Sequence, residues 1–227
     1  MSNAVTAVVP AAGIGSRMGS ELPKQYLLLN GKPILEHTLS RLLAHPAIEQ
    51  VVVALAPHDA WFDALPMASD PRVVRVEGGG ERANSVLNAL MVVESDWVMV
   101  HDAARPCITA GDMDRLITVA QQGEGAILGS RVRDTMKRTN GAGEIVATVD
   151  RDELWHALTP QMFPTRTLRR ALEEGLVLGA LITDEASAME RAGYCPRMVE
   201  GRADNLKVTR PEDLALASLY LRQQDAL

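Results

Sequence analysis

Short apolar runs recur along this chain with helix-like segments between them, and this alternation limits the possible folds more than any other feature. The runs have the length of strands and are apolar at nearly every position, which is typical of strands covered on both faces. They span residues 5–9, 50–55, 73–76, 97–100 and 126–128. Apolar residues at helical spacing lie between them, most clearly over 34–43, 85–91 and 113–117. Strands that alternate with helices predict an α/β fold, a Rossmann-like and mostly parallel sheet with helices on both faces.

The alternation stops after residue 130, where the pattern changes to that of a hairpin. Two short extended runs, 134–138 and 144–149, flank Asn140-Gly141, and this dipeptide between such runs is a strong hairpin signal. The runs are amphipathic, so we expect an arm over about residues 131–154 that projects from a single domain spanning 1–227. An isolated hairpin is marginally stable in water, and a second copy of the chain is the natural partner for it.

Composition excludes several classes of partner. The chain has 23 basic and 29 acidic residues and a net charge of −6, whereas a non-specific nucleic-acid surface needs a basic excess. The sequence has no apolar run of about 18 residues and no signal-peptide pattern, so we expect no membrane span. Cys107 and Cys195 lack metal-ligand spacing and suit a reducing compartment, which predicts a cytoplasmic protein.

The first apolar run leads into a glycine-rich loop that also carries two cations. Gly13 and Gly15 allow backbone N–H groups to approach phosphate oxygens, and Arg17 and Lys24 can neutralise their charge. The glycines alone fit a tight turn equally well. Met18 stands where a dinucleotide-binding fingerprint needs glycine, which argues against a dinucleotide-dependent dehydrogenase. The paired cations favour a polyphosphate ligand.

Three later segments, also at predicted strand ends, carry similar chemistry. The glycines at 78–80 permit close approach to a flat ligand such as a base, or simply a flexible loop. Asp102 follows a buried strand, where a carboxylate needs a metal, a cation or a ligand hydroxyl, and Arg105 could grip a phosphate or pair with it. Lys207 could face the same phosphates or lie in a solvated loop. Thr183 has a purely structural interpretation as the N-cap of a helix with acids in its first turn.

The sequence shows no signature of nucleophilic or zinc chemistry. Its five histidines have no metal-ligand spacing, and it contains no nucleophile elbow. Transfer between two anionic phosphates depends on cations and positioning more than on a protein nucleophile. The cations of the glycine loop therefore remain the strongest functional signal.

Taken in order, these motifs resemble the 2-C-methyl-D-erythritol 4-phosphate cytidylyltransferase family. The loop over 10–18 with Pro23-Lys24-Gln25 is similar to that of sugar-nucleotide pyrophosphorylases in general. The more specific segments are 101–106, 134–135, 148–151, 158–161, 183–186 and 201–209. The resemblance covers essentially the whole chain. It implies transfer of CMP from CTP, with Mg²⁺, to 2-C-methyl-D-erythritol 4-phosphate, and a homodimer formed through the arm.

The resemblance also implies a role for each matching residue. The catalytic residues would be Arg17, Lys24, Arg151 and Lys207. The nucleotide would be held by Pro10, Ala11, Ala12, Gly13, Gly15, Gly79, Gly80 and Ser85. The acceptor would be held by Asp102, Arg105, Thr135, Thr159, Thr183 and Asp204. Asp102 is also a candidate metal ligand, although the CTP phosphates would hold most of the ion.

The resemblance also implies that the partner subunit contributes to the site, and it shows one departure from the family pattern. Thr135, Arg151 and Thr159 would come from the partner subunit. Gly80 stands where relatives often carry an acid, so a side-chain contact to the base from this position would be lost.

Two alternatives stay open from the residues alone. One is a cytidylyltransferase for another polyol phosphate, such as ribitol 5-phosphate. The other is a non-catalytic nucleotide sensor with the same fold, although a sensor could dispense with Arg17 and Lys24.

Overall fold

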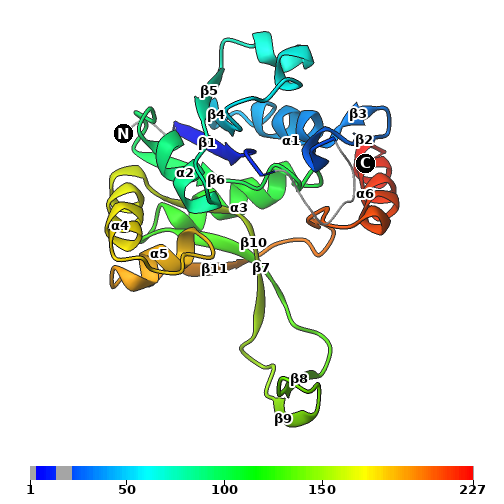
Figure 1. The fold of residues 1–227 in the computed structure, drawn as a ribbon, viewed down its shortest axis with the longest axis vertical. Coiled ribbons are helices and arrows are strands. Elements are labelled where there is room, and N and C mark those ends of the chain that lie inside the picture. Colours follow the sequence, from blue (N-terminus) through cyan, green and yellow to red (C-terminus); the bar gives the residue numbers. More distant parts are fainter. Residues whose placement is uncertain (1–3, 14–21, 227) are drawn as a thin grey trace.

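The computed structural model describes residues 4–13 and 22–226, which build a central sheet between layers of helices (Figure 1). In these residues the sheet has seven strands, in the order β11-β7-β10-β6-β1-β4-β5. Their bounds are Val5–Pro10 (β1), Ile48–Leu55 (β4), Val73–Glu77 (β5), Trp97–Val100 (β6), Ala126–Arg131 (β7), Trp155–Pro164 (β10) and Arg197–Glu200 (β11). β10 runs antiparallel to β6 and β7, and the other pairs are parallel. The predicted α/β fold with a mostly parallel sheet is confirmed.

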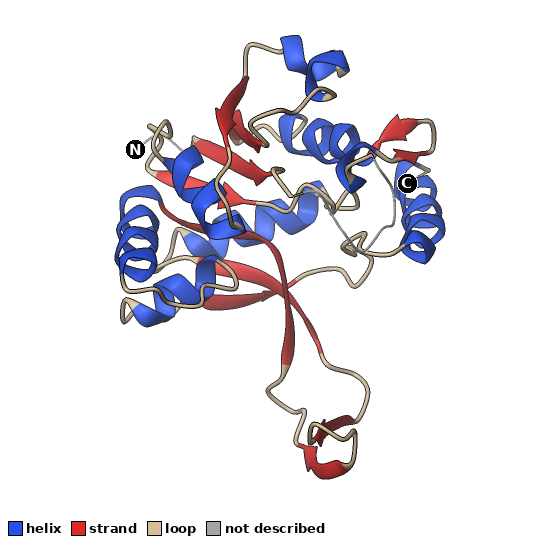
Figure 2. Ribbon diagram, viewed as in Figure 1, coloured by secondary structure: helices blue, strands red, loops and turns tan. Residues whose placement is uncertain are grey.

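Helices cover both faces of the sheet (Figure 2). One face packs against α1 (Ile34–Leu43) and α3 (Ala110–Ala120), and the other against α2 (Arg82–Leu90), α4 (Thr165–Val177) and α5 (Glu185–Arg191). The last helix, α6 (Pro211–Asp225), packs beside the small β2–β3 sheet (Leu28–Leu29 and Lys32–Pro33). None of the helices in the described ranges is long and apolar enough to cross a membrane.

The apolar runs become central strands because their side chains alternate between two cores. In β1, Val5, Ala7 and Val9 join the core under α1 and α3, whereas Val8 joins the core under α2 and α4. A run that is apolar at every position can satisfy both faces in this way, whereas an alternating run can bury only one. The six buried residues of α1 form one face, which is the helical pattern predicted from the sequence.

The order of the strands creates a crevice at their carboxyl ends. β1 pairs with β4 on one side and with β6 on the other, so the chain changes direction across the sheet between β1 and β6. Ligands of open α/β sheets bind at such a switch point, outside the carboxyl ends of the strands. The loops after β1, β5 and β6 meet there.

A hairpin arm projects from the sheet where β7 and β10 leave it (Figure 1). β8 (Met136–Thr139) and β9 (Ile145–Val149) pair in a separate two-stranded sheet, and Ile145 is 66% exposed. The turn differs from a two-residue Asn-Gly turn, because the Asn140 N–H donates to Glu144 across a five-residue reversal. The Asn140 side chain accepts hydrogen bonds from the backbone of Ala142 and Glu144, and Gly143 has the positive φ, 82°.

Candidate active site

A cavity of about 200 Å³ lies at the switch point between β1 and β6. It is lined by Pro10, Ala11, Ala12, Gly13, Lys24, Gln25, Gly79, Gly80, Glu81, Arg82, Ser85, Asp102, Ala103, Ala104 and Lys207. All the predicted nucleotide-holding residues that the structure describes therefore line one cavity. Gly15 and Arg17 lie outside the described residues.

The wall of this cavity depends on two closely packed glycines, because Gly78 lies against the loop after β1 and Gly79 lies against α2. A Cβ on Gly78 would lie 2.4 Å from the Cβ of Ala12, and one on Gly79 would lie 2.3 Å from the Cβ of Asn84. The Gly79 N–H also donates to the Ser85 hydroxyl at 3.0 Å. By contrast, a Cβ on Gly80 would meet no described atom within 4 Å. Sequence reasoning assigned Gly79 and Gly80 to the site and missed the equally close contact at Gly78.

Lys24 lies on a short 3₁₀ turn, Lys24–Tyr26, that is anchored on both sides. Its Nζ donates to the carbonyl of Val208 at 3.3 Å, so Lys24 contacts the residue that follows Lys207. The buried Gln25 amide donates to the Ala11 carbonyl at 2.7 Å, and the Tyr26 hydroxyl donates to Asp59 at 2.7 Å. These anchors hold a lysine at the mouth of the glycine-lined cavity.

A second cavity, of about 280 Å³, adjoins the first. It is lined by Arg82, Asp102, Arg105, Ala157, Leu158, Thr159, Gln161, Thr183, Asp184 and Lys207. Arg82, Asp102 and Lys207 line both cavities, so a single charged wall separates two compartments. Such an arrangement can hold two anionic ligands next to each other.

Asp102 is the centre of this charged wall. Its Oδ1 accepts from Arg82 Nε at 3.1 Å, and its Oδ2 lies 2.9 Å from Lys207 Nζ and 3.4 Å from Arg105 Nε. Burial alone would raise the pKa of Asp102, but the charges of Arg82, Lys207 and Arg105 hold that pKa well below its ordinary value. The Asp102–Arg105 pair, an alternative left open by the sequence, is present within this larger network.

The same contacts bear on the candidate metal role of Asp102. A divalent cation bound to this carboxylate would lie beside three positively charged side chains, and both carboxylate oxygens already face cations. Residues 4–13 and 22–226 contain no cluster of three or more His, Cys, Asp or Glu side chains able to hold a metal. The described residues therefore do not fit a protein-held metal at Asp102.

Thr159 belongs to its own chain's cavity, which corrects the expectation that the partner subunit supplies it. Its hydroxyl accepts from the Asp102 N–H at 3.0 Å and lies 3.0 Å from His101 Nδ1. His101 Nε2 lies 3.0 Å from the Arg105 carbonyl, a geometry that fits a neutral ring donating from Nε2 and accepting at Nδ1. Burial lowers the pKa of His101 to about 4, so the ring is neutral near pH 7.

Thr159 reaches this position because β10 is irregular. The register of β10 against β7 shifts between Ala157 and Gln161, and the intervening residues bulge into the second cavity. After the bulge, the Gln161 amide donates to Asp184 at 2.9 Å and accepts from the Ala186 N–H at 2.9 Å. The bulge thereby places the start of α5 beside the cavity.

The N-cap of α5 is Asp184, one residue after the predicted Thr183. The Asp184 side chain accepts from the Ser187 N–H, and the Ser187 hydroxyl faces the Asp184 backbone in return. Aspartate is at least as good an N-cap as threonine, and the reciprocal contact with Ser187 decides the position. Thr183 lines the second cavity instead.

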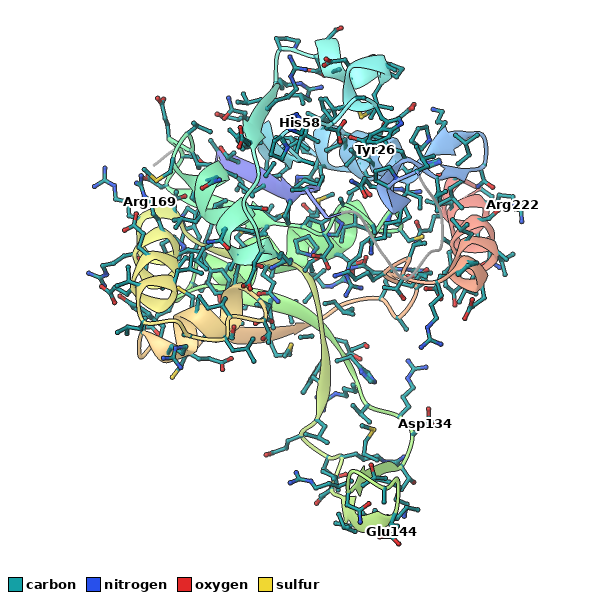
Figure 3. All side chains as sticks on the ribbon, in the orientation of Figure 1. Tyr26, His58, Asp134, Glu144, Arg169 and Arg222 are labelled. Atoms are coloured by element: carbon teal, nitrogen blue, oxygen red, sulfur yellow. The ribbon has the colours of Figure 1, made fainter. Side chains whose placement is uncertain are left out.

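Three predicted acceptor or catalytic residues lie elsewhere. Thr135 and Arg151 are exposed on the arm, and Arg151 bonds the Arg133 carbonyl there. In Figure 3 the side chains of Asp134 and Glu144 show how the arm extends away from the sheet. Asp204 pairs with Arg202 at 2.6 Å and accepts from Gln224, outside both cavities as the described residues form them. The structure thus separates Asp204 from the acceptor-side residues with which it was grouped.

Sequence reasoning missed several charged residues of the site. Glu81, Arg82 and Asp184 line the cavities, and Glu185 pairs with Arg82 beside them. Arg82 follows the 78–80 glycines as the first residue of α2, and that position was the available signal. Glu185 is the first residue of α5. The helix dipole alone explains an acid at that position, so the sequence gives no separate functional signal for it.

The fold and the site together define a class of protein. A glycine-lined cavity at the switch point of a mostly parallel α/β sheet, joined to a second cavity by cations, suits a nucleotidyltransferase, which brings two anionic phosphates together. A family model described as 2-C-methyl-D-erythritol 4-phosphate cytidylyltransferase matches residues 5–223. The chain belongs to this family.

Individual relatives agree with the family match. The 2-C-methyl-D-erythritol 4-phosphate cytidylyltransferase of Aeromonas hydrophila is 76% identical over 222 residues, covering 98% of this chain and 91% of that protein. The protein of the same name from Tolumonas auensis is 61% identical, covering 97% of each. Among solved structures, that of the Francisella tularensis protein of the same name is 35% identical with a TM-score of 0.83, covering 96% of this chain and 99% of the other.

Proposed function

We propose that the two joined cavities are the substrate sites for transfer of CMP from CTP to 2-C-methyl-D-erythritol 4-phosphate, with release of pyrophosphate. The observation that carries the proposal is the shared wall, because Lys207 and Arg82 face both compartments. CTP occupies the glycine-lined cavity, where backbone N–H groups and Lys24 meet its phosphates. The acceptor occupies the second cavity, beside Arg105 and Thr159.

The reaction needs positioned cations rather than a protein nucleophile. A phosphate oxygen of the acceptor forms a bond to the α-phosphorus of CTP, and the bond from that phosphorus to the bridging oxygen breaks. Pyrophosphate leaves with the electron pair of the broken bond. Lys24 and Arg17 stabilise the charge that develops at the α-phosphate, and Lys207 holds the acceptor's phosphate in line.

A divalent cation such as Mg²⁺ enters as part of the substrate, bound to the CTP phosphates. This assignment follows from the three cations around Asp102, which make that carboxylate a poor ligand. Mg²⁺ commonly binds nucleotide phosphates with few protein ligands. When bound, it reduces the negative charge of the triphosphate.

A second copy of the chain completes the acceptor site through the arm. Thr135 and Arg151 are exposed on that arm, and the apolar Ile145 and Val146, nearer its turn, are 66% and 58% exposed. Such side chains on an isolated two-stranded sheet need a partner surface. In this arrangement Arg151 of one chain meets the acceptor phosphate in the other chain.

The test is a coupled pyrophosphate assay with the full-length protein. CTP, UTP, ATP and GTP are each paired with 2-C-methyl-D-erythritol 4-phosphate and with ribitol 5-phosphate. Pyrophosphate released mainly from CTP with the methylerythritol acceptor supports the proposal. Equal or faster turnover with ribitol 5-phosphate assigns the chain to the other acceptor, and CTP binding without turnover indicates a sensor.

Gly78 and Gly123 offer a matched pair of variants for the nucleotide cavity. Gly78→Ala places a methyl group 2.4 Å from Ala12 and forces the two loops apart, so the KM for CTP should rise about tenfold. Gly123→Ala adds the same methyl group outside both cavities, in space clear of described atoms, and should leave this KM within about twofold. Steady-state kinetics at saturating acceptor measure both. Equal effects of the two variants would contradict the wall assigned to Gly78.

A further inference from the structure

Arg82 is the side chain that joins three separate elements at the boundary between the cavities. It is the first residue of α2, and its Nε donates to Asp102 at the end of β6. Its two terminal nitrogens donate to both carboxylate oxygens of Glu185, the first residue of α5, at 2.7 and 3.1 Å. α2 borders the nucleotide cavity and the start of α5 borders the acceptor cavity, so one guanidinium spans both.

The pairing with Glu185 fixes the orientation of this guanidinium. Glu185 is 1% exposed, and a two-pronged contact with a planar guanidinium leaves the arginine little freedom to rotate. Burial would lower the pKa of Arg82, but Glu185 and Asp102 raise it above its ordinary value, so the group stays charged. Glu185 lines neither cavity among the described residues, so it can act on a ligand only through its neighbours.

Because the guanidinium is fixed, the two oxygens of Asp102 contact different cations. Arg82 occupies Oδ1, which leaves Oδ2 for Lys207 and Arg105. If Arg82 rotated away, both oxygens would turn toward Lys207 and Arg105. These two cations would then be more fully neutralised and would attract the acceptor's phosphate less strongly.

We propose that Arg82, held by Glu185, is a positioning residue that sets Asp102 and Lys207 for the acceptor. This inference rests on the proposed function, because it assigns the second cavity to the acceptor. It assigns Glu185 a role in acceptor affinity although that side chain touches no ligand. The base end of the nucleotide cavity, formed by glycine backbone, depends on this pairing much less.

The experiment compares Glu185→Gln with Arg82→Lys in the full-length protein. Glu185→Gln keeps the shape but removes the charge that orients Arg82, so the KM for the acceptor should rise about tenfold. The KM for CTP should stay within about twofold, which separates positioning from a general loss of structure. Arg82→Lys keeps the positive charge but loses the two-pronged contact with Glu185, and it should raise the acceptor KM at least as much.

The double variant tests whether Glu185 acts through Arg82. If it does, Arg82→Lys with Glu185→Gln should show the same acceptor KM as Arg82→Lys alone, because the contact is already lost. Independent effects that multiply would overturn the inference.

Arg72→Lys is the matched control, because Arg72 makes a similar fork to Asp70 on the surface, away from both cavities. It should leave both KM values unchanged. Thermal midpoints of all variants confirm that each one is folded at the assay temperature. An acceptor KM that stays within twofold in Glu185→Gln, or an equal rise in both KM values, would also overturn the inference. If the wild-type protein releases no pyrophosphate from CTP and acceptor, the proposed function fails instead, so the two failures are distinguishable.

Discussion

Replacement of Lys24 by alanine is expected to lower kcat by about 10²–10³-fold, the usual cost of removing one positioned group that stabilises transition-state charge. The KM for CTP should change far less, because the glycine-lined backbone still binds the nucleotide. Lys24 is held at the cavity mouth by the anchors of Gln25 and Tyr26, so its charge is placed before the substrate arrives. A cation that is fixed in advance acts mainly on the charge that develops during the reaction.

The measurement is kcat for pyrophosphate release under saturating CTP and acceptor, with circular dichroism to show that the variant is folded. Lys32→Ala is the matched control, because Lys32 is an exposed lysine that pairs with Glu36 on the surface. It should retain wild-type kcat. A Lys24→Ala enzyme with near-normal turnover would remove Lys24 from the transfer site.

The central strands were predictable because each run is apolar on both faces. β10 was not predicted, and its sequence explains why. Pro160 and Pro164 both argue against a central strand, since proline cannot donate to a sheet ladder. The chain accommodates Pro160 in the bulge between Ala157 and Gln161, and this departure from regular pairing also places Thr159 in the site.

The residues that follow strands were predictable for a related reason. Gly79, Asp102 and Lys24 line one cavity because the carboxyl ends of parallel strands meet at one edge. The contact of Arg82 with Glu185 was not predictable, because 103 residues separate them and neither has a local signal for the other. Only the packing of α2 and α5 beside the same strand ends brings them together.

Replacement of Arg151 by alanine is expected to lower kcat/KM for the acceptor by about 10–100-fold, since one charge-assisted contact to a phosphate contributes about 1.5–3 kcal/mol. The KM for CTP should change much less. Arg151 is exposed on the arm, which extends away from the central sheet (Figure 1). The exposed arm residue Arg138 provides the control, and Arg138→Ala should leave both constants unchanged.

Mixing two impaired variants tests which chain Arg151 serves. Arg151→Ala chains and Lys24→Ala chains are unfolded together, refolded as a mixture, and assayed at low acceptor concentration. If the arm completes the neighbour's site, each mixed dimer has one site with both residues intact, made from Lys24 of one chain and Arg151 of the other. Random pairing in a two-fold dimer then restores roughly a quarter of wild-type activity. If Arg151 serves its own chain, every site in the mixture lacks one of the two residues, and the activity stays at the level of the separate variants.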